Sequence, residues 1–76
     1  MIQIELKLFV TLAKYLPSKS EAYDIPEGTT INQLITDLGI PNDIVKLIFI
    51  NGKKQNPDYR ILHKDRVGLF PPVGGG

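Results

Sequence analysis

The chain has 76 residues, of which 42% are hydrophobic and 22% are charged, with a formal net charge of +1 and no cysteine. This length accommodates one small domain and excludes a second. A domain of this size buries only about 60% of its unfolded surface, so we expect modest stability. The absence of cysteine excludes disulfides, thiolate metal sites and a catalytic thiol, and the near-neutral charge does not indicate nucleic acid or a membrane surface as a partner.

Residues 2–10 alternate between apolar and other side chains, which predicts a half-buried strand. The side chains expected to face inward are Ile2, Ile4, Leu6, Leu8 and Val10. The side chains expected on the other face are Gln3, Glu5, Lys7 and Phe9, so Phe9 is the one aromatic residue on the polar side. Because this alternation leaves no continuous apolar stretch, we expect neither a signal peptide nor a membrane span here.

A helix is predicted to start at Thr30, because Thr30 and Gln33 have the spacing of a capping box. Apolar residues follow at i, i+3, i+4 and i+7, namely Ile31, Leu34, Ile35 and Leu38. Gly39, with Pro41 just beyond it, supplies the usual end of a helix. Before this helix, residues 11–16 are expected to form a helical turn or a loop, and residues 21–25 a second strand.

The second half of the chain predicts three more strands. Residues 45–50 are almost entirely apolar, as in an inner strand, and Asn51-Gly52 is typical of a type I′ turn into a short edge strand at Lys53 and Lys54. Residues 56–65 are expected to be irregular and to contain His63, to which we assign no metal or catalytic role. Residues 66–70 read as the last strand, with Phe70 facing outward.

This element order predicts an α+β fold of the β-grasp type, in which one helix covers one face of a mixed sheet of four to five strands. We expect residues 1–70 to form this domain and residues 71–76 to form a flexible C-terminal tail. The first and last strands are expected to be adjacent at the centre of the sheet. Phe9 and Phe70 would then lie together on the uncovered face and form a partner-binding patch.

The tail carries most of the functional information. It consists of Pro71, Pro72, Val73, Gly74, Gly75 and Gly76. The prolines favour an extended backbone, and the glycines can thread a channel too narrow for side chains. A terminal carboxylate is ionised at neutral pH and needs activation before a nucleophile attacks it. Since the chain has no phosphate-binding loop or paired metal ligands, an activating partner is expected, and the chain itself is not expected to be an enzyme. A frayed glycine-rich end is the alternative interpretation.

At these residues the chain resembles the MoaD/ThiS family of ubiquitin-like sulfur carriers. The resemblance depends on Phe9-x-Thr11-Leu12, Asn51-Gly52, Asp65-x-Val67 and Phe70-Pro71-Pro72-Val73-x-Gly75-Gly76. It implies that a ubiquitin-activating-type adenylyltransferase uses MgATP to adenylate Gly76. A cysteine desulfurase or rhodanese-like donor then converts Gly76 to a thiocarboxylate, and the chain itself binds no cofactor.

Within this family the tail looks more like MoaD, the small subunit of molybdopterin synthase, whose large subunit accepts the tail. The resemblance therefore implies sulfur donation in the biosynthesis of molybdopterin, the molybdenum or tungsten cofactor. We expect a cytoplasmic location, with which the absence of cysteine is consistent. Two alternatives use the same tail: a ThiS-like carrier for thiamine thiazole synthesis, and a protein modifier that forms isopeptide bonds through Gly76. A noncatalytic β-grasp binding module is a third and would not need a terminal glycine.

Overall fold

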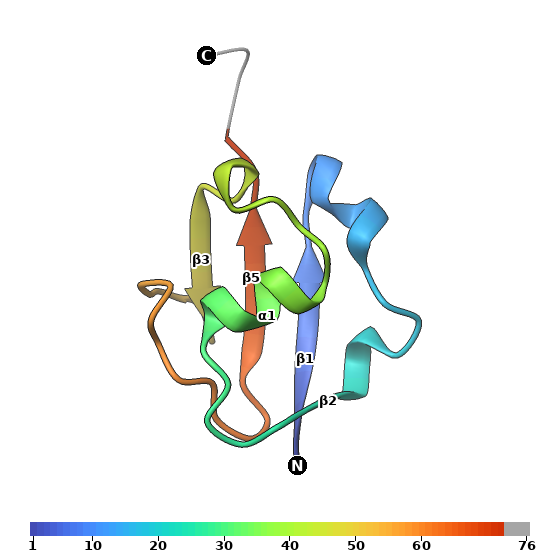
Figure 1. The fold of residues 1–76 in the computed structure, drawn as a ribbon, viewed down its shortest axis with the longest axis vertical. Helices are drawn as coiled ribbons and strands as arrows, with labels where there is room; N and C mark the ends of the chain where they lie inside the picture. Colours follow the sequence, from blue (N-terminus) through green and yellow to red (C-terminus); the bar gives the residue numbers. More distant parts are fainter. Residues whose placement is uncertain (73–76) are drawn as a thin grey trace.

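In the computed structural model of the protein, residues 1–72 are described. Five strands form one sheet in the order β2-β1-β5-β3-β4 (Figure 1). The strands are β1 (Ile2–Leu8), β2 (Tyr23–Ile25), β3 (Leu47–Ile50), β4 (Lys53–Lys54) and β5 (Arg66–Phe70). The helices in this range are the α-helix α1 (Ile31–Asp37) and the short 3-10 helices η1 (Val10–Tyr15), η2 (Ser20–Ala22) and η3 (Asn42–Ile44). The predicted element order and the α+β class are therefore confirmed.

The central pair of strands is parallel, and the other strand pairs are antiparallel, so the sheet is mixed. In the β1–β5 pair, Lys7 lies opposite Gly68 and Leu8 opposite Leu69. The Phe9 backbone N–H extends the pairing by donating to the Leu69 carbonyl oxygen at 3.2 Å. Because the two strands run in the same direction, their C-terminal ends meet at the same edge of the sheet.

Helix α1 covers one face of the sheet, as Figure 1 shows. The Thr30 hydroxyl accepts a hydrogen bond from the Gln33 N–H, and the Gln33 side chain accepts one from the Thr30 N–H, so the predicted capping box is present. Buried apolar side chains from both layers form one core: Ile4, Leu6, Leu8, Leu12, Ile25, Ile31, Leu34, Ile35, Ile40, Ile48, Ile50, Ile61, Val67 and Leu69. The alternation of the sequence thus identifies the inner face of β1, β3 and β5.

The prediction for Val10 is wrong. Strand β1 ends at Leu8, and Val10 is 77% exposed instead of facing the core. Its φ of 54° places it in the left-handed region, where a side chain costs about 1–2 kcal/mol. This backbone conformation turns the chain away from the strand into η1, whose Leu12 is fully buried. After Leu8, the next core residue is therefore Leu12 and not Val10.

Two other strands are shorter than predicted. The second strand was expected over residues 21–25, but β2 starts at Tyr23 because Glu21 belongs to η2. The inner strand was expected over residues 45–50, but β3 starts at Leu47, since Val45 closes η3. Both corrections affect strand ends only. The pairing partners of each strand are as expected for a β-grasp.

A buried carboxylate holds the start of β5 against the β3–β4 turn. Asp65 is 5% exposed and accepts hydrogen bonds from Asn51 Nδ2 at 2.9 Å, the Tyr59 hydroxyl at 3.0 Å and the Leu62 N–H at 2.8 Å. Asn51 Oδ1 in turn accepts from the Arg66 N–H at 2.9 Å. Asn51 has a φ of 53° and the following glycine a φ of 84°, which agrees with the predicted type I′ turn.

Burial raises the pKa of Tyr59 above its ordinary value, and the hydrogen bond to Asp65 and the negative charge of Asp65 add to this effect. The neutral phenol donates to the carboxylate, whereas a phenolate would be repelled by it. The raised pKa means that this stabilisation is complete below the unfolded pKa of about 10 and is lost as the pH rises through the folded pKa.

We expect Tyr59→Phe to lower the free energy of unfolding by about 1 kcal/mol at neutral pH, since one hydrogen bond is lost. The difference from the unsubstituted protein should shrink above about pH 10, because the phenol then ionises in the unfolded chain before it ionises in the folded one. Urea unfolding measured across this pH range tests both points. Tyr23→Phe is the matched control, because the Tyr23 hydroxyl makes no hydrogen bond within residues 1–72. Parallel curves for Tyr59→Phe and the unsubstituted protein would contradict the assigned role.

Candidate functional site

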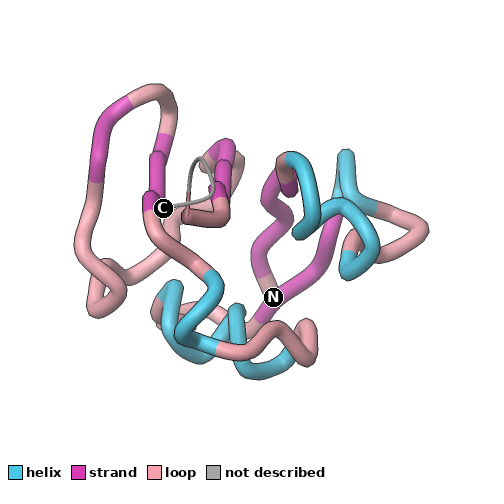
Figure 2. Tube along the Cα trace, turned by 90° about the horizontal axis from the view of Figure 1, so that it is seen from above, coloured by secondary structure: helices cyan, strands magenta, loops and turns pink. Residues whose placement is uncertain are grey.

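The candidate site is the face of the sheet that α1 leaves open. Seen from above in Figure 2, α1 and η3 lie on one side of the central strands. On the opposite side, three strands contribute side chains to a groove of about 480 Å³. The residues that line it are Lys7, Phe9, Phe49, Asn51, Gly52, Arg66, Val67, Gly68 and Phe70.

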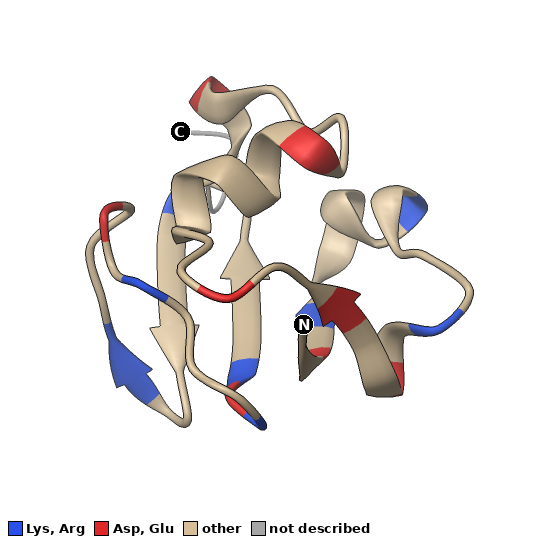
Figure 3. Cartoon of the chain, turned by 60° about the horizontal axis from the view of Figure 1, so that its bottom comes forward, with Lys and Arg blue, Asp and Glu red and all other residues tan. Residues whose placement is uncertain are grey.

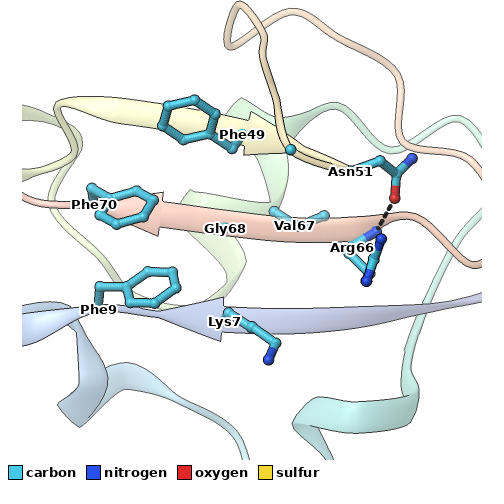
Figure 4. A pocket seen from close by; sticks show the side chains of 9 residues that line it. Lys7, Phe9, Phe49, Asn51, Arg66, Val67, Gly68 and Phe70 are labelled. Atoms are coloured by element: carbon cyan, nitrogen blue, oxygen red, sulfur yellow. Dashed lines mark hydrogen bonds between the residues drawn. The ribbon is translucent and has the colours of Figure 1, made fainter.

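Three aromatic rings form one end of this groove, and we call Phe9, Phe70 and Phe49 the aromatic row (Figure 4). The rings of Phe9 and Phe70 are stacked, with centroids 4.2 Å apart and planes 4° from parallel. Phe49 meets Phe70 edge to face, at 5.5 Å and 82°. Each ring is half-buried. The prediction that Phe9 lies beside Phe70 on the uncovered face is therefore confirmed.

Phe49 was not predicted as part of this site. The available signal was the alternation within β3, because Ile48 and Ile50 face the core and Phe49 must then face outward. Its contact with Phe70 depends on the β3–β5 register, which places Phe49 opposite Gly68. The apolar sequence of residues 45–50 does not reveal that register.

Gly68 forms the floor of the groove. A Cβ atom at this position would lie 3.5 Å from Phe9 Cε2 and 3.8 Å from Phe70 Cε1, which is ordinary van der Waals contact. Since glycine has no side chain, the groove keeps an open space over the Gly68 backbone, beside the two stacked rings. An apolar group of a partner can enter this space and contact the aromatic rings.

The tail begins at the aromatic end of the groove. Strand β5 ends at Phe70, whose carbonyl oxygen accepts a hydrogen bond from the Lys46 N–H at 2.8 Å. Pro71 follows half-buried, and Pro72 is exposed. The other predicted tail residues, which are Val73, Gly74, Gly75 and Gly76, lie outside the described residues.

Within residues 1–72 no three His, Cys, Asp or Glu side chains are grouped as metal ligands. No helix in the same range combines the length and the apolar character needed to cross a membrane.

His63 makes a structural contact that was not predicted. Its Nδ1 accepts a hydrogen bond from the Gln3 N–H at 3.1 Å and so joins the turn before β5 to the start of β1.

A family model described as the ThiS family matches residues 6–76, which is almost the whole chain. The chain belongs to the ThiS family. This is a family of ubiquitin-like sulfur carriers, which work with activating enzymes and sulfur-accepting enzymes. Comparison with curated proteins gave no match.

Solved structures show the same ubiquitin-like β-grasp fold as this ThiS-family chain. A putative molybdopterin converting factor, subunit 1, from Pyrococcus furiosus is 23% identical, with a TM-score of 0.74 over 96% of this chain and 100% of that chain. Small archaeal modifier protein 1 from H. volcanii is 21% identical, with a TM-score of 0.72 over 96% of this chain and 100% of that chain. At these identities the likeness establishes the fold and not the pathway.

We expect Phe9→Asp to keep the fold, with a loss of about 1–2 kcal/mol in the free energy of unfolding, because the substitution removes one ring contact from a half-buried position. Leu8→Asp is the matched control: the neighbouring side chain is 7% exposed and faces the core, so a carboxylate there should unfold the domain. Urea unfolding and amide spectra of both variants test the assignment of faces. Unfolding of Phe9→Asp would contradict it.

Proposed function

We propose that this chain carries sulfur as a thiocarboxylate on Gly76 and donates it in molybdopterin biosynthesis. The observation that carries the proposal is the position of the tail: β5 ends at Phe70, a member of the aromatic row, and continues directly into Pro71. A partner that docks on the aromatic row would therefore receive the tail beside its own docking surface. Family membership supports the carrier role, and the Pro71-Pro72 pair supports the MoaD-like assignment.

The chemistry requires a partner at each step. A carboxylate is a poor electrophile, so an adenylyltransferase first joins Gly76 to AMP from MgATP and releases pyrophosphate. The persulfide sulfur of a cysteine desulfurase or rhodanese-like donor then attacks the acyl carbon and releases AMP. A partner thiol reduces the resulting acyl disulfide, forming a disulfide of its own and freeing the thiocarboxylate. The resulting thiocarboxylate is the form that transfers sulfur. In this proposal the chain is a carrier and not an enzyme, and it contributes a reactive end and a docking surface.

The aromatic row is proposed to dock the adenylyltransferase and then the sulfur-accepting enzyme, which is the molybdopterin synthase large subunit in the favoured pathway. Partly exposed aromatic side chains that lie together are typical anchors of interfaces. Gly74 and Gly75 are proposed to thread the active-site channel, with Pro71, Pro72 and Val73 holding the tail extended. All of these steps are proposed to take place in the cytoplasm.

Two other acceptors fit the same activated tail. The structural likeness to small archaeal modifier protein 1 favours protein modification, in which a target lysine would attack the activated Gly76. The match to the ThiS family model favours a sulfur acceptor in thiazole synthesis. We rank both below molybdopterin biosynthesis because of the Phe70-Pro71-Pro72-Val73 sequence.

Deletion of Gly75 and Gly76 should abolish adenylation and leave thermal stability unchanged. Acyl transfer needs the reacting atoms within about 3–3.5 Å, and the shortened tail falls about 6–7 Å short of a fixed active site. The variant and the unsubstituted protein would each be incubated with the cognate adenylyltransferase and MgATP, and pyrophosphate release would be measured.

One residue added after Gly76 is the matched control for tail length, because it places the Gly76 carbonyl carbon in a peptide bond and presents a different carboxylate. This extended protein should also fail as a substrate. Adenylation of either variant at the unsubstituted rate would refute the carrier function and favour the binding-module alternative.

A further inference from the structure

The groove on the open face changes from apolar to cationic along its length. The aromatic row forms one end, and the side chains of Lys7 and Arg66 lie toward the other end (Figure 4). Lys7 is opposite Gly68, and Arg66 precedes Gly68 by two residues on β5. With a rise of about 3.3 Å per residue, the backbone of Arg66 lies about 6.6 Å from that of Gly68.

More positive charge borders the same groove. Lys54 is the cross-strand partner of Phe49, so both side chains project from the same face of the sheet. Figure 3 shows the cations of β4 beside β3 and those at the start of β5. Lys7, Lys54 and Arg66 are all exposed. A ligand can therefore reach each of these charges without unfolding any part of the sheet.

These cations are weakly neutralised within the chain. The one ion pair found among residues 1–72 joins Lys7 Nζ to Glu5 Oε2 at 3.7 Å, with both side chains partly exposed. Exposed pairs of this kind contribute little, so an incoming carboxylate can compete for Lys7. Arg66 and Lys54 have no ion pair in the described part of the chain.

We propose that this groove recognises a segment of a partner protein that presents an aliphatic side chain and a carboxylate about 7 Å apart, two residues along an extended chain. The aliphatic group occupies the space above Gly68, against the rings of the aromatic row. The carboxylate lies between Lys7 and Arg66. This inference rests on the docking role proposed for the open face and is independent of the chemistry of Gly76.

An acidic protein segment fits the groove better than the other occupants. A second copy of this chain would bring the cations of two open faces together, which is unfavourable. A nucleic acid would need many cations along its phosphates, and the chain has a net charge of only +1. The combination of aromatic rings and few cations matches an apolar residue with an acidic neighbour.

The test uses short synthetic peptides in which leucine and glutamate alternate at every second position, with serines between them. Amide spectra of the full chain are recorded during titration with this peptide, with a glutamine analogue and with a lysine analogue. We expect the glutamate peptide to shift the amides of Lys7, Gly68 and Phe70. The glutamine analogue should bind about two- to fivefold more weakly per charge removed, and added salt should reduce this difference.

Substitutions of single charged residues test which charges of the groove contribute to peptide binding. Lys7→Gln and Arg66→Gln should each weaken binding of the glutamate peptide about two- to fivefold, and Glu5→Gln should strengthen it by a similar factor. Lys19→Gln changes the net charge equally but lies outside the groove, so it should leave affinity unchanged. Deletion of Gly75 and Gly76 should also leave affinity unchanged, which separates a failure of this inference from a failure of the carrier function.

Three outcomes would overturn the inference. The first is equal binding of the glutamate, glutamine and lysine peptides, or binding of none of them. The second is a set of shifts centred on residues outside the groove. The third is a concentration-dependent shift of the groove amides without peptide, which would identify a second copy of the chain as the occupant.

Discussion

The parallel pairing of β1 with β5 is the constraint on which the rest of this molecule depends. It joins residues from the two ends of the sequence, from Glu5 opposite Arg66 to Leu8 opposite Leu69. Because the strands run in the same direction, Phe9 and Phe70 arrive at the same edge and stack at 4.2 Å. The chain then leaves β5 at that edge, so the aromatic row lies where the chain continues into Pro71.

The two faces of the sheet differ in what they contact. The inner face packs Leu6, Val67 and Leu69 against α1, and this apolar burial supplies most of the stability of such a small domain. The outer face carries the groove. Asp65 fixes the far end of β5 through three hydrogen bonds, so the cationic end of the groove is positioned by a buried polar network and the aromatic end by the strand pairing.

Local patterns were sufficient to predict most of the fold. The capping box at Thr30, the alternation in β1 and the Asn51-Gly52 turn each depend on neighbouring residues, and the structure confirms all three. Val10 was misplaced because alternation alone cannot show where a strand ends. At that end Val10 has a φ of 54° and is exposed, and Leu12 of η1 is buried instead.

The candidate site was only half predictable for a similar reason. Phe9 and Phe70 followed from the expected adjacency of the terminal strands, whereas Phe49 required the register of a third strand. The buried contacts of Asp65 and the link between His63 and Gln3 join segments far apart in the sequence, and no local pattern encodes such pairs. The pairing between distant segments therefore decides these contacts, and the local periodicity of the sequence does not predict it.

The central claim is that Gly76 carries sulfur, and the intact mass of the protein purified from its own cells tests this claim most directly. The account predicts a fraction in which one oxygen is exchanged for sulfur, located on the C-terminal peptide and reactive toward an alkylating reagent. Alkylation also separates this product from oxidation of Met1, which is the one methionine in the chain. A protein with an unmodified C-terminal peptide, recovered from cells in which its activating enzyme is active, would contradict the account.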